Sequence, residues 1–332
     1  EAINIAKAPK LISFNCLPND KILSNMVLIP KNFEFVKIFD KKCLMVNYKS
    51  IKLSSGLYFV STPIGSARDI TLRALDILAN ADVLVAEDTR TLKKLLEIHD
   101  IQLKNRKVIS YHDHNGNKIR PKLIAHLEQG KSIAYSSEAG TPLIADPGFS
   151  LLTEVLSLGI NVTGAPGPCA LIAALTVAGL PTDRFYFEGF LPNSKSQREL
   201  KFRELKSYSG TLIFYESAKR LSDTLLKATE VFGADRQGVV CREITKKFEE
   251  IRRGSLKELL EFYHDKIVKG EIVFLLAGAG NSDIDQSEID RNLKRALKSM
   301  SVKDSAEAVA LAMNLPRRDL YQQALKIKSD GD

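Results

Sequence analysis

Polar residues and glycine- or proline-rich turns follow five short apolar segments in the first half of this sequence. The clusters are Thr62 to Gly65, Glu87 to Arg90, His112 to Asn115, Ser137 to Pro142, and Gly164 to Pro168. Any one of them contains residues that turns and helix N-caps require. Five clusters at equivalent places favour a binding site, because ligands of open α/β sheets bind beyond the carboxyl ends of the strands. The sequence therefore predicts a small-molecule site built from strand-end loops.

Familiar phosphate- and metal-binding patterns are absent from these loops or incomplete. No G-x-G-x-x-G motif follows the first apolar segment, and the Walker-like string at 130–132 lacks its first glycine. His112 and His114 flank Asp113 and could bind a metal, but no second His or Cys cluster completes a ligand set. Glycine- and proline-rich turns suit a ligand held by backbone groups against an apolar surface. A nucleoside with an amino-acid tail is one such ligand.

The segments that must position these loops alternate between short apolar runs and amphipathic stretches. This pattern is typical of strands alternating with helices. Predicted strands span 57–61, 83–86, 108–111, 133–136 and 160–162, and predicted helices span 71–79, 91–99, 117–129, 150–157 and 168–178. The alternation predicts a parallel sheet covered by helices on both faces.

The rhythm changes near Gly179-Leu180-Pro181, where a second α/β domain is predicted to begin. Its predicted strands span 185–187, 212–215, 238–242 and 272–276, with helices at 194–206 and up to 232. Three short helices near 288–299, 302–313 and 317–328 predict a small helix-turn-helix-like appendage. The predicted parts are an atypical N-terminal extension (1–55), two α/β domains (56–180 and 181–280) and a helical domain (285–328).

The positive charge of the chain is concentrated near its beginning. The 332 residues carry 48 Lys+Arg and 40 Asp+Glu, a net charge of +8, which invites a nucleic-acid interpretation. Residues 1–55 hold nine Lys, no Arg and four acids, so they account for +5 and leave +3 for the other 277 residues. Bulk charge therefore does not predict RNA binding. We interpret 1–55 as an extension ahead of a native start near Met45, or else as a small ordered arm.

Composition excludes several classes of protein. Hydrophobic residues make up 44% and charged residues 27% of the chain, which excludes collagen-like and wholly disordered proteins. No apolar run approaches about 18 residues, so no membrane-spanning helix is expected. The four cysteines lie far apart without a C-x-x-C motif, which predicts neither a disulfide framework nor a zinc site. We expect a protein of the cytoplasm.

An ordered set of motifs resembles the ribosomal RNA branch of the tetrapyrrole-methylase superfamily of S-adenosylmethionine (SAM) dependent methyltransferases. The motifs are TPIG at 62–65, DIT at 69–71, EDTR at 87–90, HDHN at 112–115, AGTP at 139–142, DPG at 146–148, PGP at 166–168, GLP at 179–181, EGFLP at 188–192, YES at 215–217, REITK at 242–246 and KGE at 269–271. The resemblance runs from about Gly56 to Gly280 and on through the helical tail. Ser61, Ser66-Ala67 and Glu138 depart from the family's usual Pro, Asn-Leu and Asp.

The resemblance implies a fold, a reaction and a set of partners. The fold is two α/β domains of the tetrapyrrole methylase, or class III SAM methyltransferase, type with a small C-terminal helical appendage. The implied reaction is transfer of a methyl group from SAM to the ribose 2′-oxygen of a cytidine in the decoding region of 16S ribosomal RNA. The implied enzyme is a homodimer that needs no metal and meets the RNA within the 30S subunit. The helical tail is expected to dock RNA or the partner subunit by a local face.

Site residues follow from the resemblance by matching motifs. Cofactor contacts are implied for Pro63, Ile64, Gly65, Ser137, Glu138, Ala139, Gly140, Thr141, Pro166, Gly167, Pro168, Phe190 and Tyr215. RNA contacts are expected from charged motifs that the cofactor does not need: Arg90, His112, His114, Arg184 and Arg242. A ribose hydroxyl is a poor nucleophile, so a base or a cation should assist it. The candidates are Lys246, Glu243, Glu216 and Glu87.

Other interpretations stay open at this point. Glu243 and Lys246 could simply pair on the surface. A tetrapyrrole-precursor methyltransferase would have the same fold, and a non-catalytic module would bind RNA without methyl transfer. A metal-dependent phosphoesterase built on His112, Asp113, His114 and Asp146 is the alternative of a different class.

Overall fold

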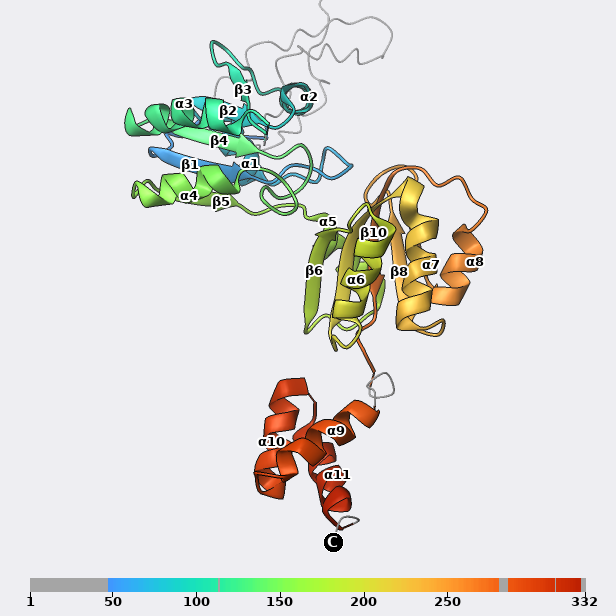
Figure 1. Ribbon diagram of the computed structural model, residues 1–332. Helices are drawn as coiled ribbons and strands as arrows, with labels where there is room; N and C mark the ends of the chain where they lie inside the picture. Colours follow the sequence, from blue (N-terminus) through green and yellow to red (C-terminus); the bar gives the residue numbers. More distant parts are fainter. Residues whose placement is uncertain (1–46, 113, 281–285, 314, 330–332) are drawn as a thin grey trace, which may run out of the picture. The chain divides into compact units, whose positions relative to one another are not determined.

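The computed structural model describes residues 47–112, 114–280, 286–313 and 315–329 (Figure 1). The predicted extension 1–55 lies outside the described residues as far as residue 46. Asp113 of the predicted histidine cluster is also outside them.

The first sheet is parallel, and its helices cover both faces, as predicted. Its strands are β1 (Gly56–Val60), β2 (Val83–Ala86), β3 (Val108–Ser110), β4 (Ser132–Ser136) and β5 (Val162–Ala165), in the order β3-β2-β4-β1-β5. The helices are α1 (Leu72–Asn80), α2 (Thr89–Ile98), α3 (Gly116–Glu128) and α4 (Phe149–Ser157). One apolar cluster joins α1 and α2 to the sheet, and another joins α3 and α4 to its opposite face. The carboxyl ends of β1, β2 and β4 therefore lie side by side.

Residues of the strand-end clusters and loops also begin two of these helices. The Thr71 hydroxyl accepts a hydrogen bond from the N–H of Ala74 (3.2 Å) at the start of α1. The Asp88 carboxylate accepts the N–H of Arg90 (2.7 Å) at the start of α2. Such caps satisfy backbone donors that have no partner inside the helix.

The fifth strand begins later than the predicted 160–162. Gly159 adopts a left-handed φ of 68° at the end of α4, and the N–H of Ile160 bonds back to Val155 (3.2 Å). Residues 159 and 160 therefore close the helix, and pairing with β1 begins at Val162.

The second sheet is mixed, with the strand order β6-β7-β10-β8-β9. Its strands are β6 (Phe185–Phe190), β7 (Thr211–Ser217), β8 (Gln237–Arg242), β9 (Glu250–Ser255) and β10 (Glu271–Leu276). Among the described strands of this sheet, β6 and β7 are the one parallel pair. The helices α6 (Lys195–Leu205), α7 (Leu221–Phe232) and α8 (Leu256–Tyr263) contribute to the apolar core on one face, and α5 (Ala170–Ala178) packs on the other. The sequence prediction grouped α5 with the first domain, whereas its apolar side chains contact the second sheet.

The prediction missed β9 and α8. The strand β9 is an edge strand with two adjacent arginines, Arg252 and Arg253, so it lacks an apolar run. A capping box between Ser255 and Glu258 starts α8, which buries Leu256, Leu259 and Tyr263. The apolar residues of α8 do recur with a helical period in the sequence. The helix was nevertheless missed because it lies between a polar strand and a polar loop.

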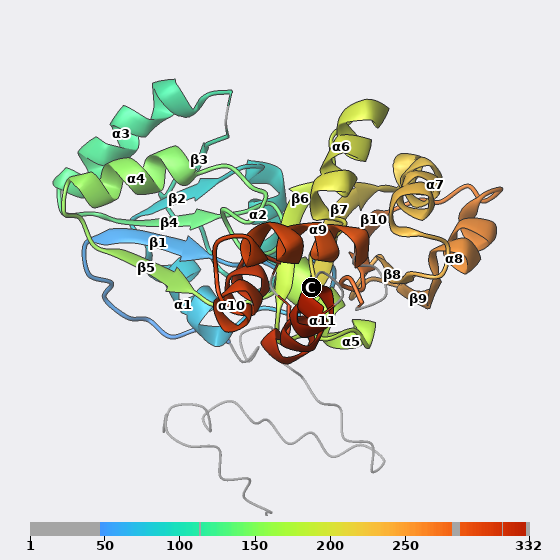
Figure 2. The same ribbon diagram turned by 60° about the horizontal axis from the view of Figure 1, so that its bottom comes forward.

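The three short helices predicted at the end of the chain are present. They are α9 (Gln286–Leu297), α10 (Val302–Met313) and α11 (Arg317–Ser329), drawn in red in Figure 2. They enclose their own core, in which Leu293, Ala306, Leu320 and Ala324 are buried. Within the described ranges of the chain, none of the helices has the length and apolar character needed to cross a membrane.

Candidate functional site

The loops after β1, β4 and β5 are fastened to one another at the carboxyl edge of the first sheet. Thr62 and Gly140 exchange backbone hydrogen bonds of 2.9 and 3.0 Å. The Ser137 hydroxyl donates to the carbonyl of Gly140 (2.6 Å), and the Thr141 hydroxyl donates to the carbonyl of Pro168 (2.9 Å). Three of the five predicted clusters thus form one connected structure.

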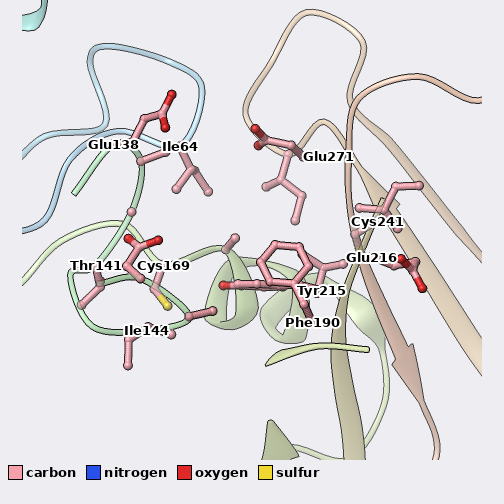
Figure 3. A pocket seen from close by; sticks show the side chains of 18 of the residues that line it. Ile64, Glu138, Thr141, Ile144, Cys169, Phe190, Tyr215, Glu216, Cys241 and Glu271 are labelled. Atoms are coloured by element: carbon pink, nitrogen blue, oxygen red, sulfur yellow. The ribbon is translucent and has the colours of Figure 1, made fainter. Parts of the chain in front are cut away.

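A cavity of about 340 Å³ lies against these loops (Figure 3). Small-molecule sites of proteins begin at about this volume. Seven of the residues implied as cofactor contacts line it: Ile64, Glu138, Ala139, Gly140, Thr141, Phe190 and Tyr215. The other six do not line it: Pro63, Gly65, Ser137, Pro166, Gly167 and Pro168. Ser137 and Pro168 do contact the lining loop, through the hydrogen bonds to Gly140 and Thr141 given above.

Gly140 is required where the lining loop turns. Its φ is 84°, and a Cβ there would lie 3.3 Å from Cγ2 of Ile64. We expect Gly140→Ala to destabilise the protein by about 1 kcal/mol and to weaken binding of the cavity's ligand. Gly130→Ala is the matched control, because Gly130 has a φ of 79° and open space around it. Thermal unfolding and ligand titration check this: equal effects of both variants on binding would contradict it.

Gly65 allows the loop after β8 of the second sheet to approach the loop after β1 of the first sheet. A Cβ on Gly65 would lie 2.5 Å from the hydroxyl of Thr245 and 2.6 Å from Cγ of Lys246. The N–H of the next residue, Ser66, donates to that same Thr245 hydroxyl (3.2 Å). The loop after β8 is therefore seated on the loop after β1.

Tyr215 forms an apolar wall of the cavity. Its ring contacts Phe187 and Phe190 edge to face, with centroids 4.8 and 5.4 Å apart. Its hydroxyl accepts the N–H of Leu171 (3.2 Å) near the start of α5. Burial raises the pKa of Tyr215, so the hydroxyl stays protonated near neutral pH. Phe190 is 60% exposed and leaves one side of this wall open.

The cavity lining is acidic. It contains Glu87, Glu138, Asp146, Glu216 and Glu271, and no Lys, Arg or His is among its described residues. Oδ2 of Asp146 is buried without a hydrogen-bond partner. Burial, together with the charges of Glu87 and Glu138, raises the pKa of Asp146 to about 7. Asp146 and Glu271 stand in motifs of the resemblance, but neither was among the cofactor, RNA or catalytic residues that it implied.

Glu216 points to the other side of its strand. In Figure 3 its carboxylate is directed away from the Tyr215 hydroxyl, as alternation along β7 requires. The carboxylate is buried, and it accepts from Nε of Arg220 (2.7 Å) and from the Thr224 hydroxyl (2.6 Å). It also accepts the N–H of Ser217 (2.7 Å). These contacts give Glu216 a structural role in joining β7 to α7.

Lys246 and two glutamates form an ion-pair cluster beside the cavity. Nζ of Lys246 lies 3.0 Å from Oε1 of Glu243 and 2.9 Å from Oε2 of Glu271. Burial alone would lower the pKa of Lys246, but its bonds to Glu271 and Glu243 outweigh burial and raise it. The pKa of Glu243 lies below its ordinary value, because it accepts the N–H of Glu271 and the ammonium of Lys246. Glu243 and Lys246 therefore do pair. The cluster that they form contacts the cavity through Glu271, which is one of its lining residues.

The residues expected to bind RNA are not all near the cavity. The side chain of Arg90 is 89% exposed and pairs with Asp88 at 2.9 Å. Nδ1 of His112 is buried without a partner, and the ring of His114 lies 6.0 Å from that of His112. Nε of Arg242 lies 3.5 Å from Oε1 of Glu250, with which it forms an ion pair. Arg184 precedes β6, whereas the cavity residue Phe190 ends that strand, about 20 Å away along it.

No group of three His, Cys, Asp or Glu side chains that could hold a metal occurs among the residues that the structure describes. The arrangement of described residues thus adds no support to the phosphoesterase alternative.

The tetrapyrrole (corrin/porphyrin) methylase family model matches residues 56–260, which is more than half of the chain. The chain belongs to this family. The RsmI C-terminal HTH domain model matches residues 283–328 of the same methylase. The resemblance and the fold class predicted from the sequence are confirmed.

Curated relatives extend this result over most of the methylase. Ribosomal RNA small subunit methyltransferase I of Mesorhizobium japonicum is 42% identical over 284 residues, covering 84% of this chain and 96% of the relative. The protein of the same name from Rickettsia prowazekii is 43% identical over 272 residues, covering 82% of this chain and 94% of the relative.

Two solved structures share the fold of the methylase. A conserved hypothetical protein of Aeropyrum pernix K1 is 17% identical with a TM-score of 0.53, covering 84% of this chain and 98% of that one. The methyltransferase CobJ is 18% identical with a TM-score of 0.52, covering 68% and 95%.

The chain is a SAM-dependent methyltransferase by its family, and the cavity fits SAM. Ile64, Ile144 and Tyr215 offer apolar surface, and the loop 138–141 offers backbone groups. The acidic lining, with the unpartnered Asp146, complements a ligand that carries a sulfonium and an ammonium group. When bound, SAM supplies an electrophilic methyl group whose leaving group is a neutral thioether.

Proposed function

We propose that this methylase transfers the methyl group of SAM to the ribose 2′-oxygen of a cytidine in the decoding region of 16S ribosomal RNA. The observation that carries the proposal is the 42% identity over 284 residues to a relative named ribosomal RNA small subunit methyltransferase I. That relationship covers 84% of this chain, so it includes most of both sheets. The match of the last three helices to the RsmI C-terminal HTH domain supports the same acceptor.

The proposal includes the setting of the reaction. The RNA is met within the 30S subunit in the cytoplasm, and the enzyme works as a homodimer. The last three helices dock the RNA or the partner subunit. The target nucleotide is extruded from the folded RNA, because ribose chemistry inside structured RNA requires access to one nucleotide.

The acidic lining of the cavity supports a position of the RNA phosphates outside it. Phosphates are repelled by the carboxylates of the lining, so they are proposed to contact cationic or hydrogen-bond-donating side chains outside it. Arg90, His112, His114 and Arg242 are proposed for this role, with Arg184 as a more distant contact. Only the ribose and base of one nucleotide approach the opening of the cavity, because SAM occupies its volume.

Four residues were candidates for activating the ribose hydroxyl, and we propose a direct part in the reaction for two of them. Lys246 is protonated and stands beside the cavity, where its charge stabilises the oxygen as it loses its proton. Glu87 lines the cavity and is proposed as the acceptor of that proton. Glu243 holds Lys246 in place, and its lowered pKa makes it a weak base. Glu216 is committed to Arg220 and Thr224.

Mapping of 16S RNA methylation by mass spectrometry tests the proposal in cells. RNA from cells that lack the protein should miss one 2′-O-methyl group on a decoding-region cytidine. The group should return with the wild-type gene. Unchanged RNA modification, with altered tetrapyrrole methylation instead, would support the alternative acceptor of the same fold.

A further inference from the structure

The acids that line the cavity differ in how their charge is balanced. Glu216 pairs with Arg220, and Glu271 pairs with Lys246. Both cations come from outside the lining: Arg220 balances Glu216, whereas Lys246 is shared with Glu243 and balances Glu271 only in part. Glu138, labelled in Figure 3, lies within electrostatic reach of Arg90.

Asp146 is an acid of the lining that no described cation balances. Its Oδ2 is buried and accepts no hydrogen bond. The charges that act on it come from Glu87 and Glu138, which are acids themselves. Among the described residues, no Lys, Arg or His pairs with it. A buried carboxylate in such surroundings requires either a proton or a cationic partner.

The two forms of the cofactor differ in charge at one atom. SAM has a positively charged sulfonium, whereas its product S-adenosylhomocysteine (SAH) has a neutral thioether, and both keep the same amino-acid ammonium and carboxylate. Methyl transfer forms the bond from carbon to the ribose oxygen and breaks the bond from carbon to sulfur. The electron pair stays on sulfur and the hydroxyl proton goes to a base, so the sulfonium charge disappears.

We infer that Asp146 makes this methylase prefer SAM to SAH by pairing with the sulfonium charge, an inference that rests on the proposed use of SAM. The attraction ends when the methyl group leaves, so the same carboxylate promotes release of the product. A charge-assisted contact in a partly buried site corresponds to a preference of about ten- to a hundredfold.

The preference depends on pH with a defined sign. Asp146 faces the carboxyl groups of Glu87 and Glu138 and the hydroxyl of Tyr215, which in turn lies beside the Cys169 thiol. The pKa of Asp146 in the free protein is about 7, so below that pH the carboxyl must lose a proton when the cation binds. The affinity for SAM should rise by up to about tenfold per pH unit as the pH increases toward 7, and level off above it.

Isothermal titration of the full chain with three ligands tests the inference. The ligands are SAM, SAH and sinefungin, in which a protonated amine takes the place of the methylsulfonium. At pH 8 the wild-type protein should bind SAM and sinefungin at least about tenfold more tightly than SAH. At pH 6 the preference should shrink. Equal affinities for the three ligands at pH 8 would overturn the inference, whereas failure of SAM to bind at all would overturn the cofactor assignment as well.

Asp146→Asn isolates the residue, and Asp235→Asn, at an exposed site outside the cavity, is its control. The Asp146→Asn variant should lose about tenfold in affinity for SAM and sinefungin and change little toward SAH. Because Asn resembles the protonated carboxyl, thermal unfolding without ligand should confirm that the variant is folded. An equal loss for all three ligands would assign Asp146 to the shared ammonium and contradict the inference.

Discussion

Replacing Lys246 by methionine is expected to lower the rate of methyl transfer about a hundredfold, with little change in the affinity for SAM. Methionine keeps much of the side chain's length and removes its charge. The charge is expected to matter because Lys246 is protonated, lies beside the cavity and holds Glu271 at 2.9 Å. Single-turnover transfer to 30S subunits, combined with SAM titration, separates the rate from the affinity.

Lys247→Met is the matched control for this experiment. Lys247 is the next residue in the chain, and its ammonium lies 5.5 Å from the ring of Phe248 rather than in the cluster. Its replacement should leave methyl transfer within about twofold of the wild-type rate. If the two variants lose activity equally, or if Lys246→Met loses affinity for SAM rather than rate, the assigned role of Lys246 is wrong.

Replacing Glu216 by glutamine is expected to lower the free energy of unfolding by about 3 kcal/mol. The change leaves the partly buried guanidinium of Arg220 without its counter-ion. It also alters the carboxylate that accepts from Ser217 and Thr224. Urea denaturation followed by circular dichroism measures the loss.

The exposed pair between Lys195 and Asp223 provides the comparison for Glu216. Asp223 lies on α7, next to Thr224 in the sequence, but its carboxylate is exposed to solvent. Asp223→Asn should therefore lower the free energy of unfolding much less than Glu216→Gln does. Folded Glu216→Gln protein, measured at a temperature well below its unfolding midpoint, should retain methyl transfer within about tenfold of wild type. A stable but inactive variant would return Glu216 to the list of catalytic candidates.

The carboxyl edge of the first sheet was predictable from local signals. Val83 to Ala86 is an apolar run that ends in polar residues, and a parallel sheet brings such ends together. No apolar run marks β9 in the sequence, so this strand was missed. An edge strand pairs on one side only and therefore tolerates Arg252 and Arg253. Edge strands and the helices that follow them depend on pairing that the local pattern does not record.

Individual roles within the site were harder to predict than its position. Asp146 looked like a turn residue before Pro147 and Gly148, and its burial among other acids arises only when separate loops meet. Glu216 looked like an available carboxylate, whereas Arg220 stands four residues later and takes it as a partner. That spacing was visible in the sequence, but the burial that makes the pair structural was not.

One reaction tests the central claim most directly: the purified methylase, SAM with an isotopically labelled methyl group, and 30S subunits from cells that lack the protein. A tetrapyrrole precursor is present as a competing acceptor, and both products are analysed by mass spectrometry. We expect one labelled methyl group on the ribose 2′-oxygen of a single cytidine in the decoding region of 16S RNA. Label on the tetrapyrrole, on a nucleobase, or on neither acceptor would contradict it.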